Sequence, residues 1–391
     1  MEDILNQGDD REPSRWPRRL GVIGAVLVVA VLGVVYLAQP HHPHSPAAAP
    51  TVSASAAEPT RIAGSDLPMA GSLRLPVAGS QPTWFSPASG VSARIGGLPA
   101  DSAGYQFTRA DGGWVVRAGS GGELASGDEE VPPLPVWFLG DGARSVTRVG
   151  TANQATPAAT AGAVWLTNYP ASADPATAAR TTREVSVTGH PLTAPVRLPA
   201  GYAIYQATDR GLLLTPVTQR TGPQADRLWN PAHPKAGRTF DAVLAASPTE
   251  IAWTPSCAAA CHVEVLDLAT GRQSSITLPS GGLAEGGAFS PTGSLLALQL
   301  MSDQSLSNQT GGPSTRLAVA STASGKVTVL PGTSVGSDTI VDFGWPTVGD
   351  SMIAEFIFPS AVQLASWHPG ASMLTVAVIS PGQLQASLVV G

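Results

Sequence analysis

The sequence predicts an all-β fold built from one repeated unit, and three observations support this prediction. Charged residues make up only 13% of the 391 residues, while Gly (42) and Pro (35) are abundant, a composition that suits short strands joined by turns. An apolar strand led by a tight turn recurs along the chain, and seven hairpins with short Gly-containing turns recur with it. Together these features predict a β-propeller of six or seven blades, with seven favoured.

The first element is an apolar segment, residues 20–38. It carries no charge and is about as long as a bilayer-spanning helix, which needs roughly 20 residues. Four arginines lie shortly before it, and no Lys or Arg follows until Arg61. The positive-inside rule therefore places residues 1–19 in the cytoplasm and the rest of the chain outside. We expect a single-pass protein of the cell membrane with one transmembrane helix.

A cleaved signal peptide is the alternative for the same segment. Its apolar core would span about 7–15 residues, with a small-residue cleavage site close behind. Here the run is longer, and the nearest Ala-x-Ala, at residues 47–49, lies well downstream. An uncleaved anchor is therefore favoured, and both interpretations place the remaining chain outside the cytoplasm.

Residues 39–66 are predicted to form a disordered linker. The segment is rich in Pro, Ala and Ser and has no apolar periodicity, as in a semi-extended tether. Its three histidines, at positions 41, 42 and 44, lack neighbouring cysteines, so we predict a solvated linker and no metal. The propeller is then expected to span residues 67–391.

The repeat is defined by two recurring elements. The strands led by a tight turn begin at Gly113, Gly162, Gly211, Glu250, Gly293 and Gly349, a spacing of about 40–50 residues that is typical of propeller blades. We interpret them as the second strand of each blade. The hairpins, interpreted as third and fourth strands, span residues 83–100, 135–150, 185–201, 226–244, 263–281, 317–332 and 362–378. Residues 380–391 are expected to pair with residues 72–79 and close the ring.

One stretch carries a family resemblance. Residues 286–300, GGAFSPTGSLLALQL, resemble the FSPDG-hydrophobic core of TolB-type and WD-repeat-like propellers, with Thr292 in place of the usual Asp. Residues 343–356 are a more degenerate copy, and no Gly-His…Trp-Asp pair is present. The repeat period of such propellers extends over residues 67–391, whereas the sequence motif is present in only one or two blades. The resemblance implies a scaffold role, and the excess of Arg over Lys resembles many actinobacterial proteins.

Candidate ligand-binding loops lie between the second and third strands of the blades. They span residues 118–134, 167–182, 215–226, 254–261 and 302–315, whereas the other turns are mostly short. In a propeller these connections all emerge on one face, and loops on a rigid scaffold commonly bind ligands. The alternative is that loop length varies without function, because it costs little stability.

Cys257 and Cys261 are the only cysteines, and both lie in the loop 254–261. On the oxidising side of a membrane, a disulfide between them is the expected pairing. Closing so short a loop removes little conformational entropy from the unfolded chain, so the bond would add little to overall stability. Its role would be to make the loop locally rigid. The adjacent His262 would leave a metal site with too few ligands, and no metal is predicted there.

No other motif predicts chemistry. The acidic run 128–130 only loosely resembles a calcium loop and is interpreted as a solvated loop. Most of the nine tryptophans lie inside apolar strands, so we expect core packing, not a sugar-stacking platform. There is no His-Glu-x-x-His and no P-loop, so no catalytic residue and no cofactor is predicted.

Three functions remain open at this point. The net charge of -6 provides no basic surface for nucleic acid. The leading hypothesis is a non-enzymatic, membrane-tethered propeller that binds a protein or another envelope component on the outer face of the cytoplasmic membrane. The alternatives are an extracytoplasmic enzyme, either glycan-cleaving or quinone-dependent, and an envelope sensor that signals through residues 1–19. An enzyme would need convergent carboxylates or a calcium site in the central funnel, and the fold alone does not decide.

Overall fold

The described part of the chain consists of 28 β-strands in seven antiparallel sheets. The structure, a computed structural model, describes residues 74–78, 81–100, 102, 104–119, 132–170, 178–217, 225–255, 261–279, 282–302, 314–336, 339–345, 351–358 and 361–379. All of them belong to one of two compact units of the chain. The other unit, Gly8–Glu58, lies outside the described residues.

Each sheet is one blade, and we number the blades in chain order. Blade 1 consists of β1 (Leu75–Val77), β2 (Thr83–Ser86) and β3 (Val91–Arg94). Blade 2 consists of β4 (Tyr105–Ala110), β5 (Gly113–Ala118), β6 (Leu134–Gly140) and β7 (Thr147–Ala152). Blade 3 consists of β8 (Gln154–Pro157), β9 (Ala163–Asn168), β10 (Thr181–Ser186) and β11 (Val196–Arg197).

The next two blades have the same four-strand order. Blade 4 consists of β12 (Tyr202–Thr208), β13 (Gly211–Pro216), β14 (Asp226–Asn230) and β15 (His233–Phe240). Blade 5 consists of β16 (Val243–Ala246), β17 (Glu250–Trp253), β18 (His262–Asp267) and β19 (Gln273–Thr277).

Blade 6 carries one additional short strand. It consists of β20 (Gly282–Phe289), β21 (Leu295–Ser302), β22 (Ser314–Ser321), β23 (Val327–Val329) and β24 (Val335–Gly336), of which β24 pairs with β22. Blade 7 consists of β25 (Ile340–Gly344), β26 (Met352–Phe358), β27 (Ala361–Trp367) and β28 (Thr375–Ile379).

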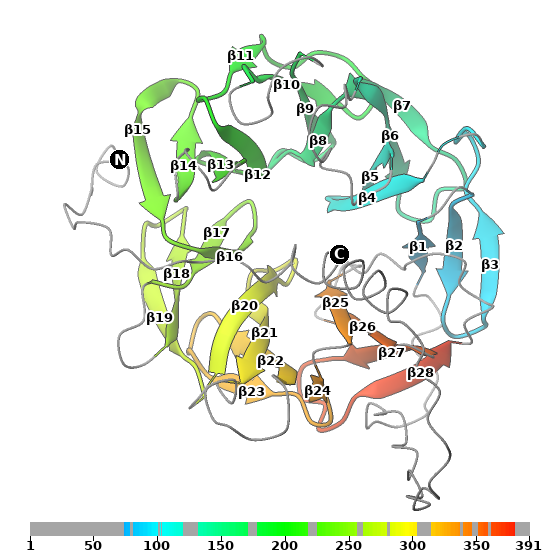
Figure 1. Ribbon diagram of the computed structural model, residues 1–391, viewed down its shortest axis with the longest axis vertical. Coiled ribbons are helices and arrows are strands. Elements are labelled where there is room, and N and C mark those ends of the chain that lie inside the picture. Colours follow the sequence, from blue (N-terminus) through cyan, green and yellow to red (C-terminus); the bar gives the residue numbers. More distant parts are fainter. Residues whose placement is uncertain are drawn as a thin grey trace, which may run out of the picture. The chain divides into compact units, whose positions relative to one another are not determined.

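The seven blades surround a common centre, with the first strand of each blade innermost (Figure 1). The protein is therefore a seven-bladed β-propeller, the larger of the two blade counts that the sequence allowed. All six strands predicted as second strands occupy that position, as β5, β9, β13, β17, β21 and β26. The seven predicted hairpins are present, from β2–β3 in blade 1 to β27–β28 in blade 7. Six of them are the third and fourth strands of their blades, as predicted, whereas β2 and β3 are the second and third described strands of blade 1.

Apolar side chains fill the space between neighbouring blades. In β5, Trp114 and Val116 pack in a cluster with blade 1, whereas Val115 packs in a separate cluster with blade 3. Successive side chains of a strand point to opposite faces of its sheet, so a middle strand of a blade is buried on both sides. This is why the second strands are continuous apolar runs without the alternation of a half-exposed sheet.

The ring is closed by packing between the last and the first blade. Leu75 and Phe85 of blade 1 share a buried cluster with Ile353, Leu364 and Ile379 of blade 7. The pairing expected between residues 380–391 and 72–79 stays a prediction, because residues 380–391 lie outside the described residues. Among the described residues, β1 pairs with β2.

The predicted N-terminal elements, residues 1–19, 20–38 and 39–66, also lie outside the described residues. The membrane anchor and the linker therefore stay predictions. Within the part of the chain that the structure describes, there is no helix with the length and apolarity needed to cross a bilayer.

The innermost strands of three consecutive blades share a β-bulge. The extra residue is Tyr205 in β12, Leu244 in β16 and Glu285 in β20. A bulge bends the strand and redirects the side chain of the extra residue. Leu244 is buried, whereas Tyr205 and Glu285 are exposed.

Candidate functional site

The predicted loops connect the second and third strands, as expected. The segment 118–134 runs from the end of β5 to the start of β6, and 302–315 runs from the end of β21 into β22. The other three segments join β9 to β10, β13 to β14 and β17 to β18. We call the side of the propeller that carries these connections the loop face, and the opposite side the turn face. The interiors of the five loops lie outside the described residues.

The described residues at the base of two of these loops form an arginine–tyrosine cluster. Arg117 lies next to the end of β5, and Tyr169 and Arg180 flank the loop between β9 and β10. The guanidinium carbon of Arg180 lies 5.2 Å from the centroid of the Tyr169 ring. Burial lowers the pKa of both arginines, and the nearby Tyr169 acts in the opposite direction. The cluster therefore places two arginines near Tyr169 at the junction of blades 2 and 3, with Arg180 over its ring.

Hydrogen bonds fix the backbone beneath this cluster. The Oδ1 atom of Asn153 accepts a hydrogen bond from the N–H of Tyr169 at 3.0 Å. The buried hydroxyls of Thr167 and Thr182 lie 3.0 Å apart and join β9 to β10. The Oδ1 atom of Asn168 is buried and has no hydrogen-bond partner among the described residues. These hydrogen bonds hold the backbone at Tyr169 in place, and among the described residues the side-chain oxygen of Asn168 beside it has no donor.

The centre of the ring carries two acidic residues on innermost strands. Glu285 on β20 and Asp342 on β25 are both exposed. Solvent reaches Asp342, but the surrounding strands displace enough water to raise the pKa of its carboxyl group, while a hydrogen bond from the N–H of Phe343 acts in the opposite direction.

The predicted disulfide is not tested. Cys261 is partly buried and packs against the core between blades 5 and 6, whereas Cys257 lies outside the described residues. The acidic run 128–130 and the linker histidines also lie outside. No group of three His, Cys, Asp or Glu side chains that could hold a metal occurs in the portion of the chain that the structure describes.

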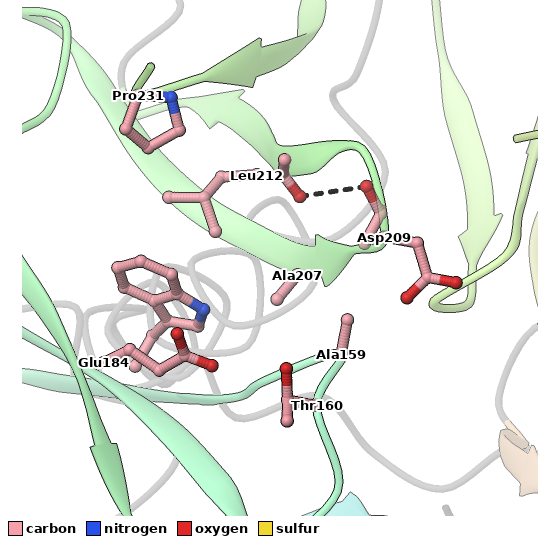
Figure 2. A pocket seen from close by; sticks show the side chains of 10 residues that line it. Ala159, Thr160, Glu184, Ala207, Asp209, Leu212 and Pro231 are labelled. Carbon is pink, nitrogen blue, oxygen red and sulfur yellow. Dashed lines mark hydrogen bonds between the residues drawn. The ribbon is translucent and has the colours of Figure 1, made fainter. Parts of the chain in front are cut away.

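A pocket on the turn face was not anticipated. It has a volume of about 230 Å³ and lies between blades 3 and 4. Trp165 and Glu184, which are paired directly across β9 and β10, contribute to its lining. Figure 2 shows Glu184 at one end and Asp209 at the other, with Ala159, Thr160 and Ala207 between them. The pocket takes residues from several strands and turns, so no local motif marks it.

The tryptophans largely follow the expectation of core packing. Trp114, Trp137, Trp253 and Trp345 are no more than 7% exposed. Trp229 and Trp367, which lie beside Pro-containing turns and for which the sequence left the choice open, are also buried. The exception is Trp165, which was expected in the core and is only partly buried, since one part of its side chain packs between the blades and another lines the pocket.

Comparison with known proteins gives structural neighbours only. No protein-family model matches the sequence, and no curated protein matches it. Similar solved structures include TolB from Acinetobacter baumannii, with 8% identity, coverage of 81% of this chain and 64% of that protein, and a TM-score of 0.40.

Two peptidases are also among the neighbours. A prolyl endopeptidase has 13% identity, covers 77% of this chain and 46% of that protein, and gives a TM-score of 0.48. An acylaminoacyl peptidase has 10% identity, covers 74% and 46%, and gives the same TM-score of 0.48. The chain thus spans less than half the length of either peptidase and less than two thirds of TolB. At 8–13% sequence identity, the functions of these proteins cannot be assigned to this chain.

Proposed function

We propose that the protein is a non-enzymatic binding propeller whose loop face captures a protein of the cell envelope. In this proposal residues 20–38 tether it to the cytoplasmic membrane, and the propeller lies outside. The observation that carries the proposal is the unequal distribution of connections: five blades place their longest connection on the same face. A single face with variable loops on a rigid support is how many scaffolds recognise a partner.

The arginine–tyrosine cluster supports this choice of face. Tyr and Arg are enriched among the residues that dominate binding energy at protein interfaces. Arg117 and Tyr169 are partly exposed, so a partner can reach them. Because Arg180 is only 4% exposed and stacks on the Tyr169 ring, that ring is already held in place before a partner arrives. A preorganised aromatic loses less entropy on binding than a mobile one.

The test is crosslinking of the tagged full-length protein in cells, followed by membrane extraction and mass spectrometry. The variant for the loop face combines Arg117→Glu with Tyr169→Ala. The matched control is Arg272→Glu, which reverses an exposed arginine in the turn between β18 and β19, on the turn face. We expect one enriched envelope protein that is lost from the loop-face variant and retained by the control. Equal recovery from both variants would contradict the proposal.

A second candidate function is glycan cleavage in the central space, and one observation favours it. Glycosidases use two carboxyl groups, of which the acid has a raised pKa. Asp342 on β25 and Glu285 on β20 both lie on innermost strands, and partial loss of water raises the pKa of the Asp342 carboxyl group. Release of reducing ends from cell-wall glycans, lost in Asp342→Asn, would favour this function. If the parent protein releases no reducing ends, glycan cleavage is contradicted.

A further inference from the structure

The pocket on the turn face is open, small and acidic. Its volume of about 230 Å³ is below the roughly 300–1,000 Å³ of typical small-molecule sites, so it suits a group of the size of one side chain. Ala207 and Leu212 of blade 4 are buried and form its apolar part, while the partly buried Glu184 contributes a carboxylate. Of the described residues, ten line the pocket and none of them is basic.

The carboxylates of the pocket are not neutralised by the cations nearest in sequence. Arg210 follows Asp209, but its guanidinium donates hydrogen bonds to the carbonyl oxygens of Leu268 (2.8 Å) and Ala269 (3.0 Å) in blade 5. Arg183 precedes Glu184, and adjacent residues of a strand point to opposite faces of the sheet.

The Glu184 carboxylate makes no hydrogen bond or ion pair with any residue in the described ranges, although Glu184 lies between two packed blades. Burial raises the pKa of this carboxyl group, as expected for an acid that has lost water without gaining a partner.

Blade 5 contains the same pair of residues with a cation already in place. Trp253 and Glu264 are direct cross-strand partners in β17 and β18, as Trp165 and Glu184 are in β9 and β10. This second pair faces blade 4 from the other side, and Arg238 of β15 reaches it. The guanidinium carbon of Arg238 lies 5.2 Å from the Trp253 ring centroid.

Arg238 is also linked to the carboxylate of that pair. It donates a hydrogen bond of 2.7 Å to Gln273, whose amide donates one of 3.0 Å to Glu264, and the charge of Glu264 raises the pKa of Arg238 against the effect of burial. A Trp–Glu pair at a blade junction of this protein thus accommodates a guanidinium group. The side chains that blade 4 presents to the first pair, Ala207, Leu212 and Pro231, cannot supply one.

We propose that the pocket formed by Trp165, Glu184 and Asp209 binds an organic cation, the ammonium or guanidinium end of a molecule no larger than a lysine or arginine side chain. The indole of Trp165 offers a cation–π surface, and the carboxylates accept charge-assisted hydrogen bonds. The source is either a side chain of another polypeptide or a free amine. This proposal does not depend on the function proposed for the loop face.

The test is ligand-observed saturation-transfer NMR on the full-length protein. The probes are N-acetyl-lysine methylamide, N-acetyl-arginine methylamide and putrescine, with N-acetyl-norleucine methylamide as the neutral control and glucose as a neutral sugar. We expect saturable binding of the cations, weaker by about tenfold or more in Glu184→Gln, and no binding of the neutral probes. Glu264→Gln, which alters the pair that Arg238 already fills, is the matched control and should bind as the parent does.

Thermal melting establishes that each variant is folded. Thr160→Trp, at an exposed turn residue beside the pocket, is a second variant that should block binding without removing a charge. A preference for the capped amino acids identifies a polypeptide side chain as the source, and a preference for putrescine identifies a free amine. No binding of any cation, binding unchanged in Glu184→Gln, or equal binding of norleucine or glucose would overturn the proposal.

Discussion

One carboxylate oxygen of Glu250, in blade 5, occupies the space in which the Cβ of any residue other than glycine at position 293, in blade 6, would lie. That oxygen, Oε2, is buried and has no hydrogen-bond partner among the described residues. Gly293 ends the Ser-Pro-Thr-Gly turn and has a φ of 70°, a region that L-residues other than Gly rarely adopt. The positive φ is therefore what requires glycine in this turn, and a Cβ would in addition displace the end of the Glu250 side chain.

Substitution Gly293→Ala is expected to destabilise the protein more than Gly142→Ala. Both glycines have φ near 70° (70° and 69°), but an added Cβ at Gly142 meets nothing within 4 Å. Gly142→Ala should therefore cost only the backbone strain, about 1–2 kcal/mol, and Gly293→Ala should cost this plus the contact with Glu250. Denaturant unfolding measures both, and Gly293→Ala combined with Glu250→Ala should recover the difference. Equal losses for the two single variants would contradict the steric argument.

Glu250 is expected to make stability decrease as pH rises. Burial, and secondarily the charge of Asp267, raise the pKa of Glu250 from its ordinary value of 4.5 to about 7. Between pH 4.5 and about 7 the folded protein keeps a proton that the unfolded chain has lost, so the free energy of unfolding decreases across this window. Glu250→Gln should remove that contribution. Melting temperatures at pH 5, 6, 7 and 8 test this, and an unchanged pH dependence in the variant would show that Glu250 is not the group responsible.

Ring closure is expected to depend on Phe85. Its side chain is 2% exposed and belongs to the cluster that joins blade 1 to blade 7. Phe85→Ala should lower the free energy of unfolding by about 3–5 kcal/mol, whereas Leu192→Ala, at a residue that is 53% exposed, should change it by about 0.5 kcal/mol or less. A loss below about 1 kcal/mol for Phe85→Ala would mean that the junction contributes little to stability.

Asp226 is expected to link blades 4 and 5. Its carboxylate is buried, and its Oδ2 atom accepts a hydrogen bond of 3.0 Å from the N–H of Val243, the first residue of β16. Asp226→Ala leaves this N–H without an acceptor and should cost about 1–3 kcal/mol. Asp226→Asn keeps an oxygen in place and should cost less. Equal unfolding free energies for the two variants would contradict the role of the hydrogen bond.

The strands and hairpins were predictable because each is encoded locally. A Gly-led apolar run such as Leu212–Leu214 in β13 is buried on both sides, and the turns are marked by glycines that adopt positive φ, such as Gly271 at 73°. The innermost strands carry a weaker signal. β20 contains three glycines and a glutamate, because its inner edge faces the central space and has less apolar surface to cover.

The turn-face pocket could not be predicted, because three independent facts create it. Register places Trp165 opposite Glu184, blade packing brings Ala207 and Leu212 against them, and the turn of blade 4 adds Asp209. None of these facts is visible in a local window of sequence. The sequence pattern also does not distinguish Trp165 from Trp253. Only the position of Arg238 in space distinguishes the Trp253–Glu264 pair, which it fills, from the open Trp165–Glu184 pair.

The burial of the middle strands on both faces has a consequence for the unfolded protein. β21 (LLALQLMS) carries no charge, and the folded ring covers it with blades 5 and 7. Once the blades separate, this apolar run is exposed and has neither a charge nor a proline to prevent pairing with another chain. Thermal unfolding is therefore expected to end in aggregation, with an apparent melting temperature that depends on the scan rate and the protein concentration.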